Sequence, residues 1–224
     1  MTHVPGQIAF LLSGAGSTLV NLLAAIDRHE VPGRVALVVS DRPGVAGLDR
    51  ARERGIAVLV VDRRAWRGRA AYSQALGHAL TPCAPDLVVL GGFLTLFDVP
   101  PDLAGRVLNV HPSLLPRHGG KGFYGEHVHR AVLAAGDLLS GCSVHVVTDE
   151  VDGGPLVAQR AVAVLPDDTP ETLAHRVQEA ERLLYPQVIA AFLRGDWRLE
   201  SGALVVRAGA RLPFAPGPSG HPLK

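Results

Sequence analysis

Short apolar runs alternate with amphipathic stretches along the first two thirds of the chain, and this alternation constrains the fold more than any other feature. Uninterrupted apolar runs are typical of strands buried on both faces, and apolar residues three and four positions apart are typical of helices. The runs predict strands at Ile8–Leu12, Val35–Val39, Ile56–Val61, Leu87–Leu90 and Val107–His111. The stretches between them predict helices at Leu19–His29, Ala46–Arg54 and Arg69–Leu80. This order predicts an α/β fold, with an open, mostly parallel, twisted sheet covered by helices on both faces.

The remaining part of the chain predicts two further strands and a long helix. Ser143–Val147 and Leu156–Val164 are separated by a polar, glycine-containing turn, so we expect paired or bent strands at one end of the sheet. Thr169 is a favourable N-cap and Pro170 a favourable first helical residue. The helix body is therefore predicted at Thr172–Leu193.

The composition indicates a globular protein of the cytoplasm. Hydrophobic residues make up 47% and charged residues 19% of the 224 residues, which suits a sizeable core. A net charge of +1 gives no reason to expect a nucleic-acid partner, and we interpret the basic clusters Arg50–Arg54 and Arg63–Arg69 as solvated faces. No secretory signal and no membrane-spanning run is recognised. We expect residues 1–200 to form one domain and residues 201–224 a tail that wraps the surface or frays.

The cysteines and histidines predict neither a disulfide framework nor a metal site. The two cysteines, Cys83 and Cys142, lie far apart and in no metal-like spacing, which fits a reduced compartment. His127 and His129 lie in a glycine-rich loop, but no third ligand has diagnostic spacing.

A loop of small residues, Ser13–Thr18, joins the first predicted strand to the first helix. Small residues let a backbone approach an anion, and a helix start offers free amides and the positive end of its dipole. A dinucleotide loop would need glycine at Leu19, and a Walker loop would need a lysine that is absent. A phosphate monoester site is favoured, while a dinucleotide site and a plain tight turn remain open.

Asn109 and His111 share one face at the end of a predicted strand, because residues two apart in a strand point the same way. An amide beside an imidazole can stabilise an oxyanion and exchange a proton near neutral pH. A buried pair that satisfies loop carbonyls is the slightly better interpretation of this pattern alone. Ser143 and His145 are likewise two apart and could face the same pocket.

The loop Asp149–Pro155 contains two glycines and can carry a carboxylate inward. A carboxylate near His111 would orient the imidazole and favour its protonated form. An acidic surface turn is an equally good interpretation of this stretch by itself.

Three motifs, taken together and in this order, resemble the glycinamide ribonucleotide formyltransferases, folate-dependent enzymes of purine biosynthesis. The motifs are Ser13-Gly14-x-Gly16-Ser17, Asn109-x-His111-Pro112-Ser113-Leu114-Leu115-Pro116, and Ser143-x-His145 followed by Asp152-Gly153-Gly154-Pro155. The resemblance covers roughly residues 7–199. It implies a Rossmann-like formyltransferase fold, with a phosphate-binding N-terminal half and a folate-binding C-terminal half. It also implies that a formyl group is transferred from the co-substrate 10-formyltetrahydrofolate to the amine of glycinamide ribonucleotide. The enzyme would use no metal and would be a monomer or a homodimer.

The resemblance also implies a role for each residue that matches a family motif. Asn109, His111 and Asp152 would be catalytic, with Ser143 and His145 in support, and Glu181 would engage the glycinamide end. The substrate phosphate would lie against Gly14, Ala15, Gly16, Ser17 and Thr18. The folate would contact Arg69, Leu94, Thr95, Leu96, Phe97, Asn109, Thr148, Asp149, Glu150, Val151 and Asp152.

The chain departs from the family pattern at three places. Thr18 replaces an asparagine, a change that keeps a hydrogen-bond donor. Thr95 stands where many members have an arginine, so a polar folate contact is missing or is supplied elsewhere. The segment Arg117–Gly125 is longer than in the shortest members, and its glycines indicate a mobile flap from which Lys121 could meet the substrate phosphate.

Other functions are compatible with parts of the pattern. A methionyl-tRNA formyltransferase would be expected to carry a further C-terminal domain and a basic surface, and a formyltetrahydrofolate hydrolase an N-terminal regulatory domain. A sugar-nucleotide formyltransferase fits the loop after the first strand less well. A non-catalytic folate or nucleotide binder would have no need of Asn109, His111 and Asp152 together.

Overall fold

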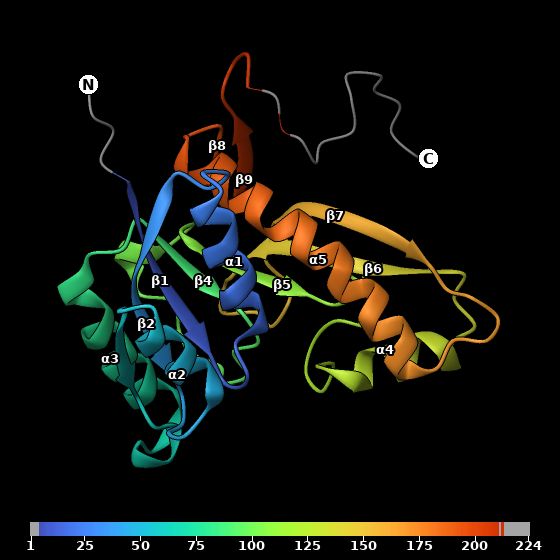
Figure 1. Ribbon diagram of the computed structural model, residues 1–224, viewed down its shortest axis with the longest axis horizontal. Helices are drawn as coiled ribbons and strands as arrows, with labels where there is room; N and C mark the ends of the chain where they lie inside the picture. Colours follow the sequence, from blue (N-terminus) through green and yellow to red (C-terminus); the bar gives the residue numbers. More distant parts are fainter. Residues whose placement is uncertain (1–4, 211, 213–224) are drawn as a thin grey trace.

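The computed structural model describes residues 5–210 and 212, and in this part of the chain seven strands form one sheet. The strands are β1 (Gly6–Leu12), β2 (Gly33–Ser40), β3 (Ala57–Val60), β4 (Leu87–Leu90), β5 (Val107–His111), β6 (Leu139–Val146) and β7 (Leu156–Ala163). Their order across the sheet is β3-β2-β1-β4-β5-β6-β7 (Figure 1). The strands from β1 to β5 run parallel, and β6 and β7 each pair antiparallel with the preceding strand. The predicted α/β fold and the paired strands at one end of the sheet are thereby confirmed.

Five α-helices accompany the sheet in the described residues. They are α1 (Ser17–Asp27), α2 (Ala46–Glu53), α3 (Gly68–Leu80), α4 (Glu126–Ala134) and α5 (Pro170–Leu193), with short 3₁₀ turns η1 (Arg63–Ala65), η2 (Thr81–Cys83) and η3 (Pro101–Leu103). Helix α5 begins as predicted: the Thr169 hydroxyl accepts from the Thr172 amide, and the Thr172 hydroxyl accepts from the Thr169 amide.

The sequence prediction missed α4 and placed its histidines in a loop. His127 and His129 lie inside this helix, and its buried residues are Val128, His129 and Val132. A helix this short is marginal by itself, and α4 is stable because its apolar stripe packs towards the core beside α5. Its sequence therefore carries only a weak local signal.

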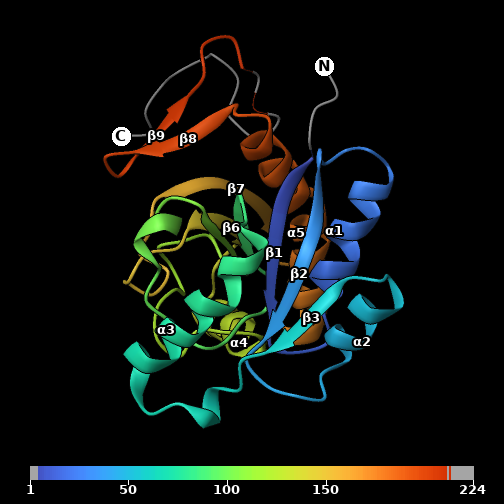
Figure 2. The ribbon, with the colours of Figure 1, turned by 90° about the vertical axis from the view of Figure 1, so that its left-hand side faces the viewer.

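The helices cover both faces of the sheet, as Figure 2 shows. Helices α1, α2 and α5 lie on one face and α3 on the other. Neighbouring residues of β1 divide between the two cores: Phe10 packs in the cluster with α1 and α5, and Ala9 and Leu11 pack in the cluster with α3. Strands covered in this way are apolar at nearly every position, which is why short uninterrupted runs predicted them correctly.

The chain continues beyond α5 as a hairpin, which the sequence prediction did not contain. Strands β8 (Trp197–Glu200) and β9 (Ala203–Val206) pair antiparallel, and Leu199 and Leu204 pack against the main core. The expected boundary between residues 200 and 201 therefore falls in the turn of this hairpin. Alternating apolar residues before Ser201-Gly202 and an apolar run after it were the available signal. Residues 211 and 213–224 of the expected tail lie outside the described residues.

Side chains of α5 fasten the sheet from one side. The Tyr185 hydroxyl is buried and lies 3.0 Å from the Leu90 carbonyl oxygen and 2.9 Å from the Leu108 carbonyl oxygen, so its proton is shared between β4 and β5. Pro186, inside the helix, cannot donate to the Arg182 carbonyl. The Asn21 side chain of α1 donates to that carbonyl instead, at 2.9 Å. Helix α5 is thus tied both to the sheet and to α1.

None of the helices in the described residues is both long enough and apolar enough to cross a membrane.

Removing the Tyr185 hydroxyl should loosen this attachment. We expect Tyr185→Phe to lower the free energy of unfolding by about 1–2 kcal/mol, because two buried carbonyls lose a donor. For a chain of this size that corresponds to a melting temperature lower by roughly 2–8 °C. Urea unfolding measures the change. Tyr124→Phe is the matched control, because the Tyr124 side chain is half-exposed. Equal stability of the two variants would contradict the attachment.

Candidate active site

The pairing of β5 with β6 brings four polar side chains together at the carboxyl end of β5. In this register Asn109 lies opposite His145, and His111 lies opposite Ser143. Ligands of open α/β sheets collect at the carboxyl ends of the strands. The two pairs that the sequence analysis singled out separately therefore form one cluster.

The imidazole of His111 is almost enclosed, with 4% of the residue exposed. Its Nε2 lies 2.8 Å from the His118 carbonyl oxygen, and its Nδ1 lies 3.5 Å from Asp152 Oδ2. Burial lowers the pKa of His111, and the Asp152 carboxylate offsets part of that effect. The imidazole is therefore held neutral and can accept a proton at neutral pH.

Asp152 reaches the cluster from the loop between β6 and β7. Its backbone is in the left-handed region (φ 53°), a conformation that bends the chain sharply and directs the carboxylate inward. Asp152 Oδ2 accepts from the Gly120 amide at 2.9 Å. Burial opposes its ionisation, but His145, His111 and the Gly120 amide together hold the pKa of Asp152 below its usual range. The prediction that this loop places a carboxylate near His111 is confirmed.

Asn109 and His145 hold each other in one orientation. The Asn109 amide nitrogen lies 3.1 Å from His145 Nε2, and His145 Nδ1 lies 3.2 Å from the Val146 carbonyl oxygen. A carbonyl only accepts, so His145 carries its proton on Nδ1 and accepts from Asn109 at Nε2. This bond uses one of the two N–H donors of Asn109. The second donor remains for a ligand oxygen.

Ser143 anchors the loop that follows His111. Its hydroxyl donates to the Ser113 carbonyl at 2.6 Å and accepts from the Leu115 amide at 2.9 Å. The Gln159 side chain of β7 donates to the same hydroxyl at 2.8 Å and to the Leu115 carbonyl at 2.9 Å. Sequence reasoning missed Gln159 and Gly120, because both act through contacts made by distant parts of the chain.

The small-residue loop after β1 opens helix α1 as expected. Gly16 is the N-cap in the left-handed region (φ 75°), and a Cβ there would lie 2.8 Å from Gly47 Cα. Arg50 of α2 donates to the Ala15 carbonyl at 2.6 Å. Arg50 therefore supports this loop, a contact that its interpretation as part of a solvated face missed.

The loop after β1 is joined to the segment after β4. The Ser13 amide donates to the Gly92 carbonyl at 3.1 Å, and the Leu94 amide donates to the Ser13 hydroxyl at 2.8 Å. Thr95 donates to Asp41 Oδ2 at 2.6 Å, and Asp41, 1% exposed, also pairs with Arg42 at 2.9 Å. The Thr95 hydroxyl is thus occupied within the protein.

Glu181 of α5 lies over the start of α1. A small hollow of about 20 Å³ is lined by Ser17, Thr18, Asn21, Gln178, Glu181 and Arg182. Burial raises the pKa of Glu181 to about 7, with a smaller opposing effect of Arg182. The carboxylate forms no hydrogen bond or ion pair with any other residue between 5 and 210. A cationic or hydrogen-bond-donating ligand would therefore stabilise its charged form.

The expected folate residues come from α3, from the segment after β4, from β5 and from the loop after β6. Arg69 joins two of their segments: its Nη2 donates to the Phe97 carbonyl at 2.9 Å and to the Asp149 carbonyl at 3.3 Å. Leu94 and Leu96 are exposed, whereas the Phe97 side chain is buried in the core with α3. Arg69 bonds both the Phe97 carbonyl and the Asp149 carbonyl, and so holds the loop that contains residues 148–152 beside this apolar surface.

The remaining candidate groups are separate from the cluster. Lys121 is exposed, and Cys83 and Cys142 are free thiols. Between residues 5 and 210 no group of three or more His, Cys, Asp or Glu side chains is arranged to hold a metal ion.

Comparisons with known proteins agree with this geometry. The family model described as formyl transferase matches residues 6–189. The phosphoribosylglycinamide formyltransferase of Escherichia coli (strain K12) is 40% identical over 209 residues, which are 92% of this chain and 96% of the relative. Glycinamide ribonucleotide transformylase 1 from Symbiobacterium toebii superposes with a TM-score of 0.82 at 38% identity, covering 90% of this chain and 94% of that one. The phosphoribosylglycinamide formyltransferase from Coxiella burnetii, in complex with CHES, also gives 0.82, at 32% identity and with 91% and 94% covered.

The raised pKa of Glu181 should make stability depend on pH. Unfolded Glu181 loses its proton near 4.5 and folded Glu181 near 7, so the folded state binds more protons between these values. Stability is therefore lost as the pH rises through this window. We expect Glu181→Gln to match the wild type near pH 5 and to exceed it by about 1–3 kcal/mol at pH 8.

Urea unfolding at several pH values measures this difference. Glu179→Gln, on the same helix and half-exposed, is the control and should run parallel to the wild type. A difference between Glu181→Gln and the wild type that does not change with pH would contradict the burial of an unpartnered carboxylate.

Proposed function

The chain belongs to the formyl transferase family, and we propose that it transfers the formyl group of 10-formyltetrahydrofolate to the amine of glycinamide ribonucleotide. The products are formylglycinamide ribonucleotide and tetrahydrofolate, in de novo purine biosynthesis. The observation that carries the proposal is the cluster of Asn109, His111 and Asp152 at the end of β5. This cluster lies two strands away from the small-residue loop Ser13–Thr18 after β1.

The cluster suits attack of an amine on a formyl carbon. The new bond joins the glycinamide nitrogen to that carbon, and the bond to the folate nitrogen then breaks. The free N–H of Asn109 stabilises the oxyanion of the tetrahedral intermediate, and the imidazole of His111 does so once it has taken up a proton. Asp152 supports His111 and helps to relay the proton that the amine loses towards the departing folate nitrogen. Holding amine and formyl carbon together contributes much of the rate.

The ribonucleotide occupies the side of the sheet near α1. Its phosphate lies against the amides and hydroxyls of Gly14, Ala15, Gly16, Ser17 and Thr18. Its glycinamide end lies near Glu181, whose carboxylate has no partner among the described residues and whose charge an amine would stabilise. Lys121 approaches the phosphate from the flap between β5 and α4.

The folate occupies the opposite side. The exposed side chains of Leu94 and Leu96 contact the pterin ring, and Arg69 closes this pocket where it joins Phe97 to Asp149. The pterin is bound mainly by backbone groups of residues 148–152. Thr95 contributes through its backbone, because its hydroxyl is bonded to Asp41.

The proposal assigns a function to each half of the chain. Within one domain at residues 1–200, the N-terminal half binds the phosphate and the C-terminal half binds the folate. Residues 201–206 complete the β8–β9 hairpin that begins in this domain, and the remaining residues follow it in the sequence. The enzyme works without a metal, as a monomer or homodimer, in the cytoplasm, where its free thiols stay reduced. It has no nucleic-acid or membrane partner.

A turnover assay tests the reaction and its acceptor together. The protein is mixed with glycinamide ribonucleotide and 10-formyltetrahydrofolate, and release of the deformylated folate is followed by absorbance. We expect release to require the ribonucleotide and to fall at least about 100-fold in Asp152→Asn, because a proton-transfer group is lost. Affinity for both substrates should change little. Asp167→Asn, an exposed position before α5, is the control that should retain full turnover.

Other outcomes of this assay lead to other functions. Release without any acceptor would identify a hydrolase. Absence of release, with the fold and folate binding intact, would exclude glycinamide ribonucleotide and direct attention to sugar-nucleotide amines. Undiminished turnover in Asp152→Asn would remove Asp152 from the mechanism.

Glu181 should contribute to ribonucleotide binding and leave folate binding alone. We expect Glu181→Gln to raise the KM for glycinamide ribonucleotide about tenfold, since a hydrogen bond to a charged group is lost. The KM for the folate should stay within about twofold. Steady-state kinetics with each substrate varied in turn separate the two effects, and Glu179→Gln serves again as the control. An equal rise in both KM values would place Glu181 outside the ribonucleotide site.

A further inference from the structure

Two residues in the left-handed region hold the His111 imidazole from its two nitrogens. Asp152 (φ 53°) presents its carboxylate to Nδ1, and His118 (φ 52°) presents its backbone carbonyl to Nε2. Residues with a side chain rarely adopt this conformation unless the surroundings impose it. The role proposed above for Asp152 accounts for one of the two. The conformation of His118 calls for a separate explanation.

The His118 carbonyl determines where the proton of His111 resides. A carbonyl oxygen only accepts, so the contact of 2.8 Å requires a proton on His111 Nε2. A neutral imidazole carries one proton, and its Nδ1 then bears a lone pair. That lone pair faces Asp152 Oδ2 at 3.5 Å. An arriving proton therefore binds at Nδ1, beside the carboxylate that stabilises it.

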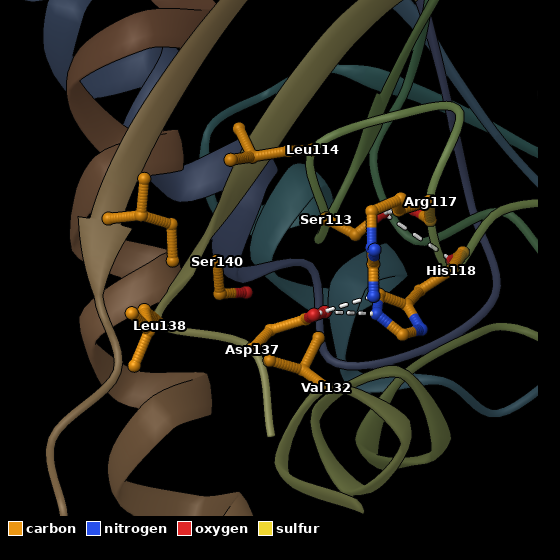
Figure 3. Close-up of a pocket in the computed structure, with 9 residues that line it drawn as sticks. Ser113, Leu114, Arg117, His118, Val132, Asp137, Leu138 and Ser140 are labelled. Atoms are coloured by element: carbon orange, nitrogen blue, oxygen red, sulfur yellow. Dashed lines mark hydrogen bonds and ion pairs between the residues drawn. The ribbon is translucent and has the colours of Figure 1, made fainter. Parts of the chain in front are cut away.

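The side chain of His118 is held by Asp137, which lies between the turn after α4 and the start of β6. His118 Nε2 lies 2.7 Å from Asp137 Oδ2, with 13% and 17% of the two side chains exposed. Figure 3 shows this pair, with Arg117 reaching the same carboxylate. Arg117 Nη2 lies 2.5 Å from Asp137 Oδ1 but is mostly exposed. The His118 hydrogen bond and the Arg117 charge hold the pKa of Asp137 below its usual range, so Asp137 is an anion that accepts both bonds.

Behind this loop the protein has a cavity in place of a packed core. It has a volume of about 300 Å³ and is lined by residues of the loop, of α4 and of the start of β6, among them Ser113, Leu114, Val132, Leu138 and Ser140. The Ser140 hydroxyl is buried beside it without a hydrogen-bond partner in the described residues. On this side the Ser113 hydroxyl holds the loop by donating to the Arg117 carbonyl at 2.6 Å. The hydrogen bond of His118 with Asp137 is the second support of the loop (Figure 3).

We infer that His118 and Asp137 are positioning residues for His111: their pair holds the His118 carbonyl against Nε2 and so selects Nδ1 as the nitrogen that exchanges a proton beside Asp152. The consequence for turnover rests on the proposed function, whereas the location of the proton does not. His118 touches neither substrate in this scheme and acts through its backbone.

The experiment measures the protonation of His111 directly, in the full-length protein. ¹⁵N-labelled histidine is incorporated, the His111 signals are assigned with His111→Asn, and the ring nitrogens are recorded at pH 8. We expect wild-type His111 to carry its proton on Nε2 alone. In His118→Asn the tautomers should mix, because asparagine tolerates a positive φ but is too short to reach Asp137. Asp137→Asn, which keeps the size of the side chain, should cause the same change.

Kinetics give the second readout. We expect both variants to lower kcat about 5–20-fold and to leave both KM values within about twofold. Arg117→Ala is the matched control: it removes the exposed partner of Asp137, keeps His118 in place, and should leave the tautomer and kcat unchanged.

The outcomes separate this inference from the proposed function. A His111 tautomer that stays unchanged in both His118→Asn and Asp137→Asn, with the fold intact, overturns the inference even if formyl transfer is fully established. A tautomer that shifts in a protein without formyl transfer supports the positioning role and defeats the proposed function. A loss of kcat in Arg117→Ala equal to that in His118→Asn would show that charge at Asp137, and not the His118 carbonyl, is responsible.

Discussion

The antiparallel pairing of β6 with β5 is the constraint on which the site depends. Up to β5 every strand runs parallel and opens its carboxyl end to ligands at the same edge. Because β6 runs the other way, it places His145 and Ser143 directly opposite Asn109 and His111. Strand β6 ends beside the amino end of β5, where the Val147 amide donates to the Val107 carbonyl, and the β6–β7 loop then brings Asp152 back to His111. If β6 were parallel to β5, only the residues at the carboxyl end of β6 would lie at this edge of the sheet.

Local electrostatics distinguish the two sides of this edge. Next to His111, the side chains of Asn109, Ser143, His145 and Asp152 each have a hydrogen-bond partner in the described residues. The carboxylate of Asp152 stays charged and the imidazole of His111 stays neutral. Near α1, Glu181 is partly buried with no partner among the described residues, and its pKa is raised. A preorganised set of dipoles suits a reaction centre, because little must move when charge develops. An unpartnered carboxylate suits a binding position that a ligand completes.

The sequence predicted the elements whose signals are local. The apolar runs of β1 and β4 and the Thr169-Pro170 helix start coincide with the observed elements, since burial on both faces and helix capping are written in adjacent residues. Helix α4 and the β8–β9 hairpin were missed because short elements are stabilised by what they pack against. Within the site, the nearness of Asp152 to His111 was expected, but the support from Gly120 was not.

The sequence by itself determined the alternation of strands and helices, the glycine-rich loop that opens α1, and the presence of Asn109 and His111 on one face of a strand. These follow from backbone geometry over a few residues. Only the tertiary structure decided which groups surround each of them. Asp41 holds Thr95 across 54 positions of the chain, and Asp137 holds His118 across 19. Such contacts depend on where the sheet brings separate loops, and no spacing between neighbouring residues records that. The protonation state of His111 is also decided by the tertiary structure, because burial and the two loops around the imidazole determine it together.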